Sequence, residues 1–218
     1  ERGRDWATVV VDFMLRDKEF YSHLMKVLAY DGNVLSHSVN TAVMGLLFGY
    51  YLGISASELL SLGTGLLFHD IGKIRIEEHT IKKDYEKLTK EERELLRKHP
   101  DMGFVLLINS GNVAREACLI AKQHHEQYNG KGYPEGLKGE EIHYYSRITS
   151  ILDEFETGLS KAADNDENSA FRVLQIMVER MEGNFDKEIL KKFIDFMRFS
   201  TIEELSVVEH NDISESVR

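Results

Sequence analysis

Two short stretches of the chain concentrate side chains that bind transition metals. In the first, His69 and Asp70 stand side by side, and in the second, His124 and His125 are followed at once by Glu126. Histidine and aspartate are the side chains that hold first-row transition metals in proteins. The two stretches lie far apart in the sequence, so neither is a local repeat of the other. The pattern therefore favours one metal site that is assembled from distant segments.

Three further residues fit the same site. His37 follows a serine at the start of an apolar helical pattern, His99 directly precedes Pro100, and Asp153 interrupts an apolar run. Each residue alone has an ordinary explanation, such as a satisfied core histidine or, for Asp153, a pair with Arg147. As a set they are costly to bury without partners, and one metal cluster would satisfy all of them. The candidate ligands are His37, His69, Asp70, His99, His124, His125 and Asp153. Surface or structural roles are expected for the other histidines, His23, His79, His143 and His210.

The composition limits the classes of function. The chain has 218 residues, 42% hydrophobic and 29% charged, which fits one fairly large globular domain or a domain with a small helical extension. A formal net charge of -10 argues against sequence-independent binding to a nucleic-acid polymer, which needs clustered lysine and arginine. A small anionic substrate stays compatible, because bound cations reverse the local field. The single cysteine, Cys118, excludes a disulfide within the chain and favours a reducing, cytoplasmic setting.

Apolar residues recur at helical spacing along nearly the whole chain, and no strand pattern is long enough for a sheet core. The sequence therefore predicts an all-α fold. Because a proline can begin a helix but cannot continue one, Pro100 places His99 at a junction between two helices. Helices are expected over residues 5–30, 34–52, 113–127, 171–181 and 187–199, with others ending near His69, beginning after Thr89 and covering Ile142 to Phe155.

The chain is expected to divide into three parts. Residues 1–34 would form an N-terminal helical extension, interpreted as the end of a linker from an upstream domain, because the start lacks both a methionine and the apolar stretch of a signal peptide. Residues 35–200 would form the functional domain, and residues 201–218 an acidic tail. No apolar segment reaches the length of a membrane span.

The motifs resemble those of a known family. The run His69-Asp70-Ile71-Gly72-Lys73 resembles the signature of the HD superfamily of metal-dependent phosphohydrolases, and the run from His124 to Gly139 closely resembles the second signature of its HD-GYP subgroup. The resemblance covers about residues 35–200. It implies an HD-type helical bundle with additional N- and C-terminal helices, a site for two or three metals, and hydrolysis of cyclic di-GMP, a bacterial second messenger.

The resemblance also implies a ligand set and a mechanism. One metal would take His37, His69, Asp70 and Asp153, and the second would share Asp70 and add His99, His124 and His125. Members with a third metal carry a glutamate where this chain has Asn33, so two divalent ions are expected. Iron suits this histidine-rich set best, then manganese, with zinc or nickel as alternatives. A metal-activated hydroxide would attack phosphorus, with Asp70 and Lys73 as catalytic residues. Lys73 would bind the phosphate, or else serve only as a cation at a helix C-terminus.

The segment after Asp153, which binds the substrate phosphates in the family that the chain resembles, departs from the family pattern. Ala162 stands in place of an arginine and Asn165 in place of a lysine, with Lys161 near enough to compensate. Tyr133 is interpreted either as a substrate contact or as an anchor for its own loop, and the loop Gly130–Gly139 would face a protein partner or the guanine end of the ligand. The altered segment keeps two alternatives open: a metal-containing binding or signalling module with little hydrolysis, and a phosphohydrolase of another nucleotide.

Overall fold

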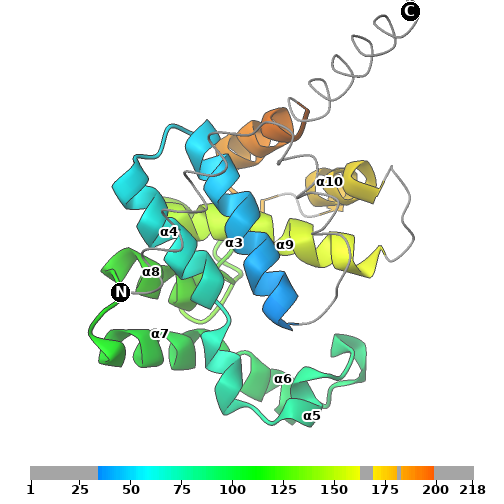
Figure 1. Cartoon of the computed structure of the whole chain (residues 1–218). Coiled ribbons are helices and arrows are strands. Elements are labelled where there is room, and N and C mark those ends of the chain that lie inside the picture. The colour runs from blue at the N-terminus through cyan, green and yellow to red at the C-terminus, as the bar shows by residue number, and fades with distance from the viewer. Residues whose placement is uncertain (1–33, 163–168, 181–182, 199–218) are drawn as a thin grey trace, which may run out of the picture.

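The computed structural model describes residues 34–162, 169–180 and 183–198. Within these ranges the regular structure is helical, apart from one isolated antiparallel bridge between Asn129 and Lys138. The prediction of an all-α fold is confirmed (Figure 1). The expected helix over residues 5–30, the acidic tail and the positions of Asn33 and Asn165 lie outside the described residues.

The helices follow the predicted order. Their bounds are α3 (Val34–Tyr51), α4 (Ala56–Phe68), η1 (Ile71–Arg75), α5 (Glu78–Ile81), η2 (Tyr85–Lys87), α6 (Lys90–Leu96), α7 (His99–Ser110), α8 (Arg115–Gln123), η3 (Gly139–Glu141), α9 (Tyr144–Lys161) and α10 (Ser169–Arg180), and residues 187–198 form a further helix. Thr89 caps α6, where its side chain accepts a hydrogen bond from the backbone N–H of Glu92 at 3.2 Å. As expected, α6 ends before His99, and Pro100 stands in the first turn of α7.

A large hydrophobic core holds most of these helices together, and a smaller cluster of Leu107, Cys118 and Ala121 packs α7 against α8. Helix α3 packs against α4 and α9, and α8 packs against α4, α7 and α9. Phe48, Phe155 and Phe193 are fully buried at its centre, and the ring of Phe193 lies 5.2 Å from that of Phe48 and 5.1 Å from that of Phe155. Edge-to-face ring pairs of this kind add to the stabilisation from burial of apolar surface. The core therefore fixes α3, α8 and α9 relative to one another.

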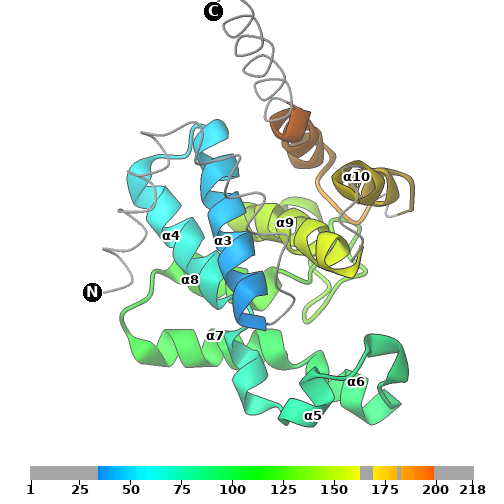
Figure 2. The ribbon, with the colours of Figure 1, turned by 45° about the vertical axis from the view of Figure 1, so that its right-hand side comes forward.

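The polar residues of interest lie where helix ends converge. In both views the first turn of α3 points towards the short elements α5 and α6 (Figures 1 and 2). Element η1 follows α4 directly and packs on α7. Gly72 makes this approach possible, because a Cβ atom at this position would overlap the carbonyl oxygen of His99 and the backbone nitrogen of Gly103. The glycine after the His69-Asp70 pair thus brings that pair next to His99.

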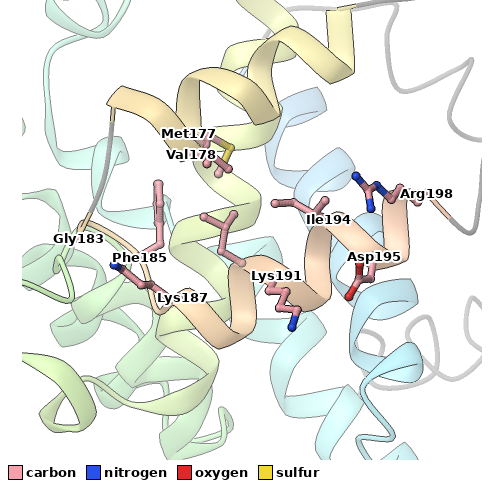
Figure 3. Close-up of a pocket in the computed structure, with 10 residues that line it drawn as sticks. Met177, Val178, Gly183, Phe185, Lys187, Lys191, Ile194, Asp195 and Arg198 are labelled. Atoms are coloured by element: carbon pink, nitrogen blue, oxygen red, sulfur yellow. The ribbon is translucent and has the colours of Figure 1, made fainter.

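A separate cavity lies away from these helix ends. It has a volume of about 420 Å³ and is formed by α10 and the helix of residues 187–198. Figure 3 shows Met177 on one side and Phe185 and Ile194 on the other. The lining is largely apolar and contains none of the candidate metal ligands.

Candidate metal centre

The seven side chains predicted as ligands come together in the fold. Ligand atoms of Asp70, His99, His124 and His125 lie within 4.8 Å of one another, and the same holds for His37, His69 and Asp70. Asp70 belongs to both groups. Asp153 lies beside the second group, with Oδ1 at 3.0 Å from Nε2 of His37 and 3.9 Å from Nε2 of His69. Residues from α3 and α9, from the segments that directly follow α4 and α8, and from the α6–α7 junction therefore form one cluster.

Three of the histidines are held in a single tautomer by backbone carbonyl groups. Nδ1 of His69, His99 and His124 lies 2.6, 2.7 and 2.9 Å, respectively, from the carbonyl oxygen of the residue three positions earlier. Each of these carbonyls belongs to the last turn of a helix, where carbonyl groups lack donors within the helix. Because a carbonyl only accepts, Nδ1 carries the proton in each ring. Nε2 of the neutral ring is then an unprotonated nitrogen with a free lone pair.

The Nε2 atoms of the histidines face one another at the spacing of metal ligands. Nε2 of His99 lies 3.1 Å from Nε2 of His124, and Nε2 of His37 lies 3.3 Å from Nε2 of His69. Two nitrogens bound about 2.1 Å from one metal at 90–110° are roughly 3.0–3.4 Å apart. Oδ1 of Asp70 is buried without a hydrogen-bond partner and lies 3.1 Å from Nε2 of His99. A divalent cation fits this donor set, because it would satisfy the orphaned oxygen and the facing lone pairs together.

His37 is oriented differently from the other histidines. Its Nδ1 donates to Oε2 of Glu156, a residue of α9 that is only 4% exposed. Asn40 and Ser160 donate to the other carboxylate oxygen of Glu156, at 2.9 and 3.2 Å. A carboxylate behind a ligand histidine fixes the ring and raises its basicity. Sequence reasoning missed Glu156, because nothing in its immediate neighbours relates it to a histidine on another helix.

Burial and charge set the protonation of the cluster. Burial lowers the pKa of His69 to about 4 and also lowers the pKa values of His99 and His125, so these rings are neutral at neutral pH. Burial alone would raise the pKa of Asp70, but the surrounding histidines and Lys73 hold it well below its usual value. Burial disfavours the charged form of His37, yet hydrogen bonds to Asp153 and Glu156 outweigh it and raise this pKa to about 10.

The two lysines predicted to bind substrate lie in different places. Nζ of Lys73 forms an ion pair with Oδ2 of Asp70, and a quarter of the lysine side chain is exposed. Lys73 therefore stands at the cluster with a face towards solvent. Lys161 is exposed in the last turn of α9, eight residues beyond Asp153, which is about 12 Å along a helix axis. Ala162 is the C-cap of the same helix.

Tyr133 lies against the cluster and also belongs to its loop. Its ring stacks on the ring of His125 with centroids 4.8 Å apart, and its other contact is the guanidinium of Arg97, 4.4 Å from the ring centroid. Burial raises the pKa of the Tyr133 hydroxyl, and the charges of Asp153 and Asp70 add to this effect while Arg97 opposes it. Both interpretations made from the sequence, substrate contact and loop anchor, are compatible with this position. Arg97 was not singled out from the sequence.

Glu126 ties the loop of residues 130–139 to the metal-ligand segment. Its buried carboxylate accepts hydrogen bonds from the backbone N–H groups of Glu135, Gly136 and Leu137 at 2.7, 3.1 and 3.0 Å. At Gly132, a Cβ atom would overlap the backbone of Glu126 itself, so the loop lies close against it. The glutamate after the paired histidines is thus a structural anchor, a role that the sequence alone did not assign.

Two of the remaining histidines agree with the prediction of surface or structural roles. The side chain of His79 is 61% exposed and lies 3.1 Å from a carboxylate oxygen of Glu77. His143 is the N-cap of α9, where its Nδ1 accepts from the N–H of Tyr145 at 3.3 Å. His23 and His210 lie outside the described residues.

Comparisons with known proteins point to one family. A family model described as an HD domain matches residues 33–189. The cyclic di-GMP phosphodiesterase response regulator RpfG of Xanthomonas campestris pv. campestris is 35% identical over 147 residues, which are 66% of this chain and 39% of RpfG. The cyclic di-GMP phosphodiesterase PdeB of Borreliella burgdorferi is 31% identical over 179 residues, 82% of this chain and 46% of PdeB. The chain thus spans less than half the length of these two relatives.

A solved structure supports the fold. Bd1817, described as an HDG"Y"P protein from Bdellovibrio bacteriovorus, superposes with a TM-score of 0.75 at 19% identity and covers 89% of this chain and 62% of that chain. At this identity the likeness concerns the fold alone. Among the described residues, no helix combines the length and the apolar character that a membrane crossing requires.

Proposed function

The chain belongs to the HD-domain family, and we propose that it is a metal-dependent phosphodiesterase that opens a cyclic dinucleotide, with cyclic di-GMP as the first substrate to test. The observation that carries this proposal is the group of histidine Nε2 atoms, unprotonated in His69, His99 and His124, and the orphaned Asp70 oxygen, which lie at ligand spacing. The names of RpfG and PdeB support the choice of substrate.

The ligands divide into two sets that share Asp70. We assign His37, His69 and Asp153 to one ion and His99, His124 and His125 to the other, with one carboxylate oxygen of Asp70 available to each. The two groups of ligand atoms within 4.8 Å support this division. Divalent ions at such a centre supply Lewis acidity and a nucleophile at neutral pH. Iron is the first expectation and manganese the second, because the set is rich in imidazole and poor in carboxylate.

The residues of the chain have separate roles around the ions. Asp70 carries its negative charge at neutral pH and holds Nζ of Lys73. An ammonium group has three donors, so Lys73 can keep this contact and donate to a phosphate oxygen from its solvent-exposed side. The charge of the lysine would then stabilise the charge that develops on the phosphoryl group. Lys73 is accordingly the phosphate-binding catalytic residue, in preference to Lys161.

The bounds of the domain, its cellular setting and its protein partner stay proposals that the sequence suggested. We propose that residues 35–200 form the HD-GYP unit, which the family match to residues 33–189 supports. The single buried cysteine, Cys118, supports a reducing, cytoplasmic setting. The loop Gly130–Gly139 remains a proposed surface for a protein partner.

Hydrolysis with product identification tests the function. Protein purified without oxygen and reconstituted with Fe²⁺ or Mn²⁺ should convert cyclic di-GMP into the linear dinucleotide, or further into GMP, and removal of the ions with a chelator should abolish the reaction. His69→Ala should lose metal and activity together. Full activity of a metal-free sample, or of a metal-depleted His69→Ala variant, would contradict the proposed mechanism.

One observation favours a second candidate, a binding module that keeps its metals and hydrolyses little. Helix α9 ends with an exposed Lys161 that does not join the cluster and with Ala162 as its C-cap, so this end of the helix gives the metal centre no arginine. Ala162→Arg separates the two functions. It should raise the turnover of an enzyme that is limited by weak binding of the substrate phosphates, and it should leave a binding module inactive.

A further inference from the structure

The arginine at the C-cap of α6 contacts a tyrosine that lies against the metal centre. The guanidinium carbon of Arg97 lies 4.4 Å from the ring centroid of Tyr133, and the same ring stacks on His125, with centroids 4.8 Å apart. Tyr133 thus links the guanidinium of Arg97 to a candidate metal ligand. A guanidinium held over an aromatic face keeps its N–H donors in the plane directed outwards, ready for an anion.

Backbone contacts fix where Arg97 stands. Arg97 is the C-cap of α6, and its backbone N–H donates to the carbonyl of Arg93 at 2.9 Å. Two residues later, the ring of His99 is anchored to the carbonyl of Leu96 at 2.7 Å. Arg97 is therefore attached to a ligand through a short, hydrogen-bonded junction as well as through Tyr133.

The charge of Arg97 is not neutralised within the described residues. Its side chain is exposed, and no carboxylate among the described residues forms an ion pair with it. Arg93, one turn earlier on the same helix, differs: it lies over Tyr85 and donates to the carbonyl of Glu86 at 3.0 Å. Arg97 is thus an available cation at the centre, whereas Lys73 is already engaged by Asp70.

We propose that Arg97 binds the second phosphodiester of a cyclic dinucleotide while the first lies at the metal ions. This inference rests on the proposed function. A planar guanidinium binds a phosphate through two parallel hydrogen bonds, and a cyclic dinucleotide carries a second phosphate that a simple phosphodiester lacks. Arg97 therefore sets the preference for cyclic dinucleotides over substrates with one phosphate. Tyr133 is the positioning residue that holds the guanidinium in place.

The test compares two substrates on the metal-loaded protein. For Arg97→Ala, the KM for cyclic di-GMP should rise about tenfold or more, as expected for loss of a charge-assisted hydrogen bond. Bis(p-nitrophenyl) phosphate has one phosphate, so it cannot use the contact that Arg97→Ala removes. Its kcat/KM in this variant should stay within about twofold of the wild-type value. Arg97→Lys should raise the KM for cyclic di-GMP less than Arg97→Ala does, because lysine keeps the charge but not the paired donors. Arg115→Ala, which removes an exposed arginine from the first turn of α8, is the matched control and should leave the kinetic constants for both substrates unchanged.

The outcomes separate this proposal from the proposed function. Wild-type hydrolysis of cyclic di-GMP with an unchanged KM in Arg97→Ala would overturn the role of Arg97 and leave the function intact. An equal fall in kcat/KM for cyclic di-GMP and bis(p-nitrophenyl) phosphate, or loss of metal from the variant, would show that Arg97 acts on the metal centre instead. The rise in KM caused by Arg97→Ala should be the same for cyclic di-GMP and cyclic di-AMP. Unequal rises would identify a contact with the base and overturn the phosphate contact. If the wild type neither binds cyclic di-GMP by calorimetry nor cuts it, both proposals fail.

Discussion

His99 and His124 direct their Nε2 atoms at one another across 3.1 Å, although neither nitrogen carries a proton in the neutral ring. Two free lone pairs at this distance repel each other unless a cation lies between them. The arrangement persists because each ring is fixed from behind by a backbone carbonyl. Asp70 adds an orphaned oxygen 3.1 Å from Nε2 of His99, which a cation at this point would also satisfy. The helix ends thus preorganise a site for a cation.

Glu156 should control the affinity of the site that contains His37. Glu156→Gln keeps the size of the side chain but removes the charge that faces Nδ1 of His37. Loss of such an outer partner typically weakens metal binding about 10–100-fold. Metal titration with a competing chelator would measure the change. Glu116→Gln, an exposed glutamate of α8, is the control and should bind metal as the wild type does. Unchanged affinity in Glu156→Gln would remove Glu156 from the site.

Metal uptake should release a proton from His37 at neutral pH. Asp153 and Glu156 overcome the effect of burial and hold the pKa of His37 at about 10, so the metal-free ring is charged at neutral pH. A histidine must lose a proton to bind a metal, and the apparent metal affinity should therefore rise with pH until about pH 10. Calorimetric titrations in two buffers of different protonation enthalpy would count the protons released. A heat of binding that does not depend on the buffer would contradict this prediction.

Much of the metal centre could be predicted from the sequence, because its ligands stand beside residues that restrict the local backbone. Pro100 fixes the helix junction at His99, and Gly72 permits the close approach that brings His69 and Asp70 to it. The all-α fold followed from helical spacing of apolar residues. The helix junction and the apolar spacing depend on near neighbours in the chain and are visible without tertiary structure, whereas the close approach at Gly72 becomes visible only in the fold.

The supporting residues could not be predicted in the same way. Glu156 and His37 are 119 positions apart, and their contact depends on how α3 packs against α9. Arg97 gains its role only when the loop folds back and brings Tyr133 into contact with both Arg97 and His125. Neither contact has a local pattern, because each residue is an ordinary polar side chain on its own helix.

Glu126 should stabilise the fold of the loop. Glu126→Gln leaves one acceptor oxygen for three backbone N–H donors and turns an amide N–H₂ group towards them. A buried site with unsatisfied donors costs about 1–3 kcal/mol, so urea unfolding of the variant should give a free energy of unfolding lower by that amount. Glu135→Gln, which removes only a surface pair with Lys122, should cost about 0–1 kcal/mol. Equal stability of both variants would mean that the loop does not depend on Glu126.

Gly72 should be sensitive to the smallest substitution. In Gly72→Ala the added methyl group would meet the backbone of His99 and Gly103, so the two segments must separate. Overpacking of this kind costs about 1–3 kcal/mol, and the separation should also weaken metal binding because it moves Asp70 from His99. Gly53→Ala provides the comparison: no atom lies near its added methyl group, although its positive φ of 77° gives a backbone cost of its own. Only Gly72→Ala should lose metal affinity, and normal metal binding in that variant would contradict the proposed contact.

The number of metal ions bound by protein purified without oxygen tests the central claim most directly. Elemental analysis after reconstitution and removal of free metal should give two ions per chain in the wild type and fewer in His69→Ala and His99→Ala, since each variant removes a ligand from one of the two sets that share Asp70. A fully reconstituted wild-type sample that holds no ion, or one whose metal content is unaffected by either substitution, would contradict the account.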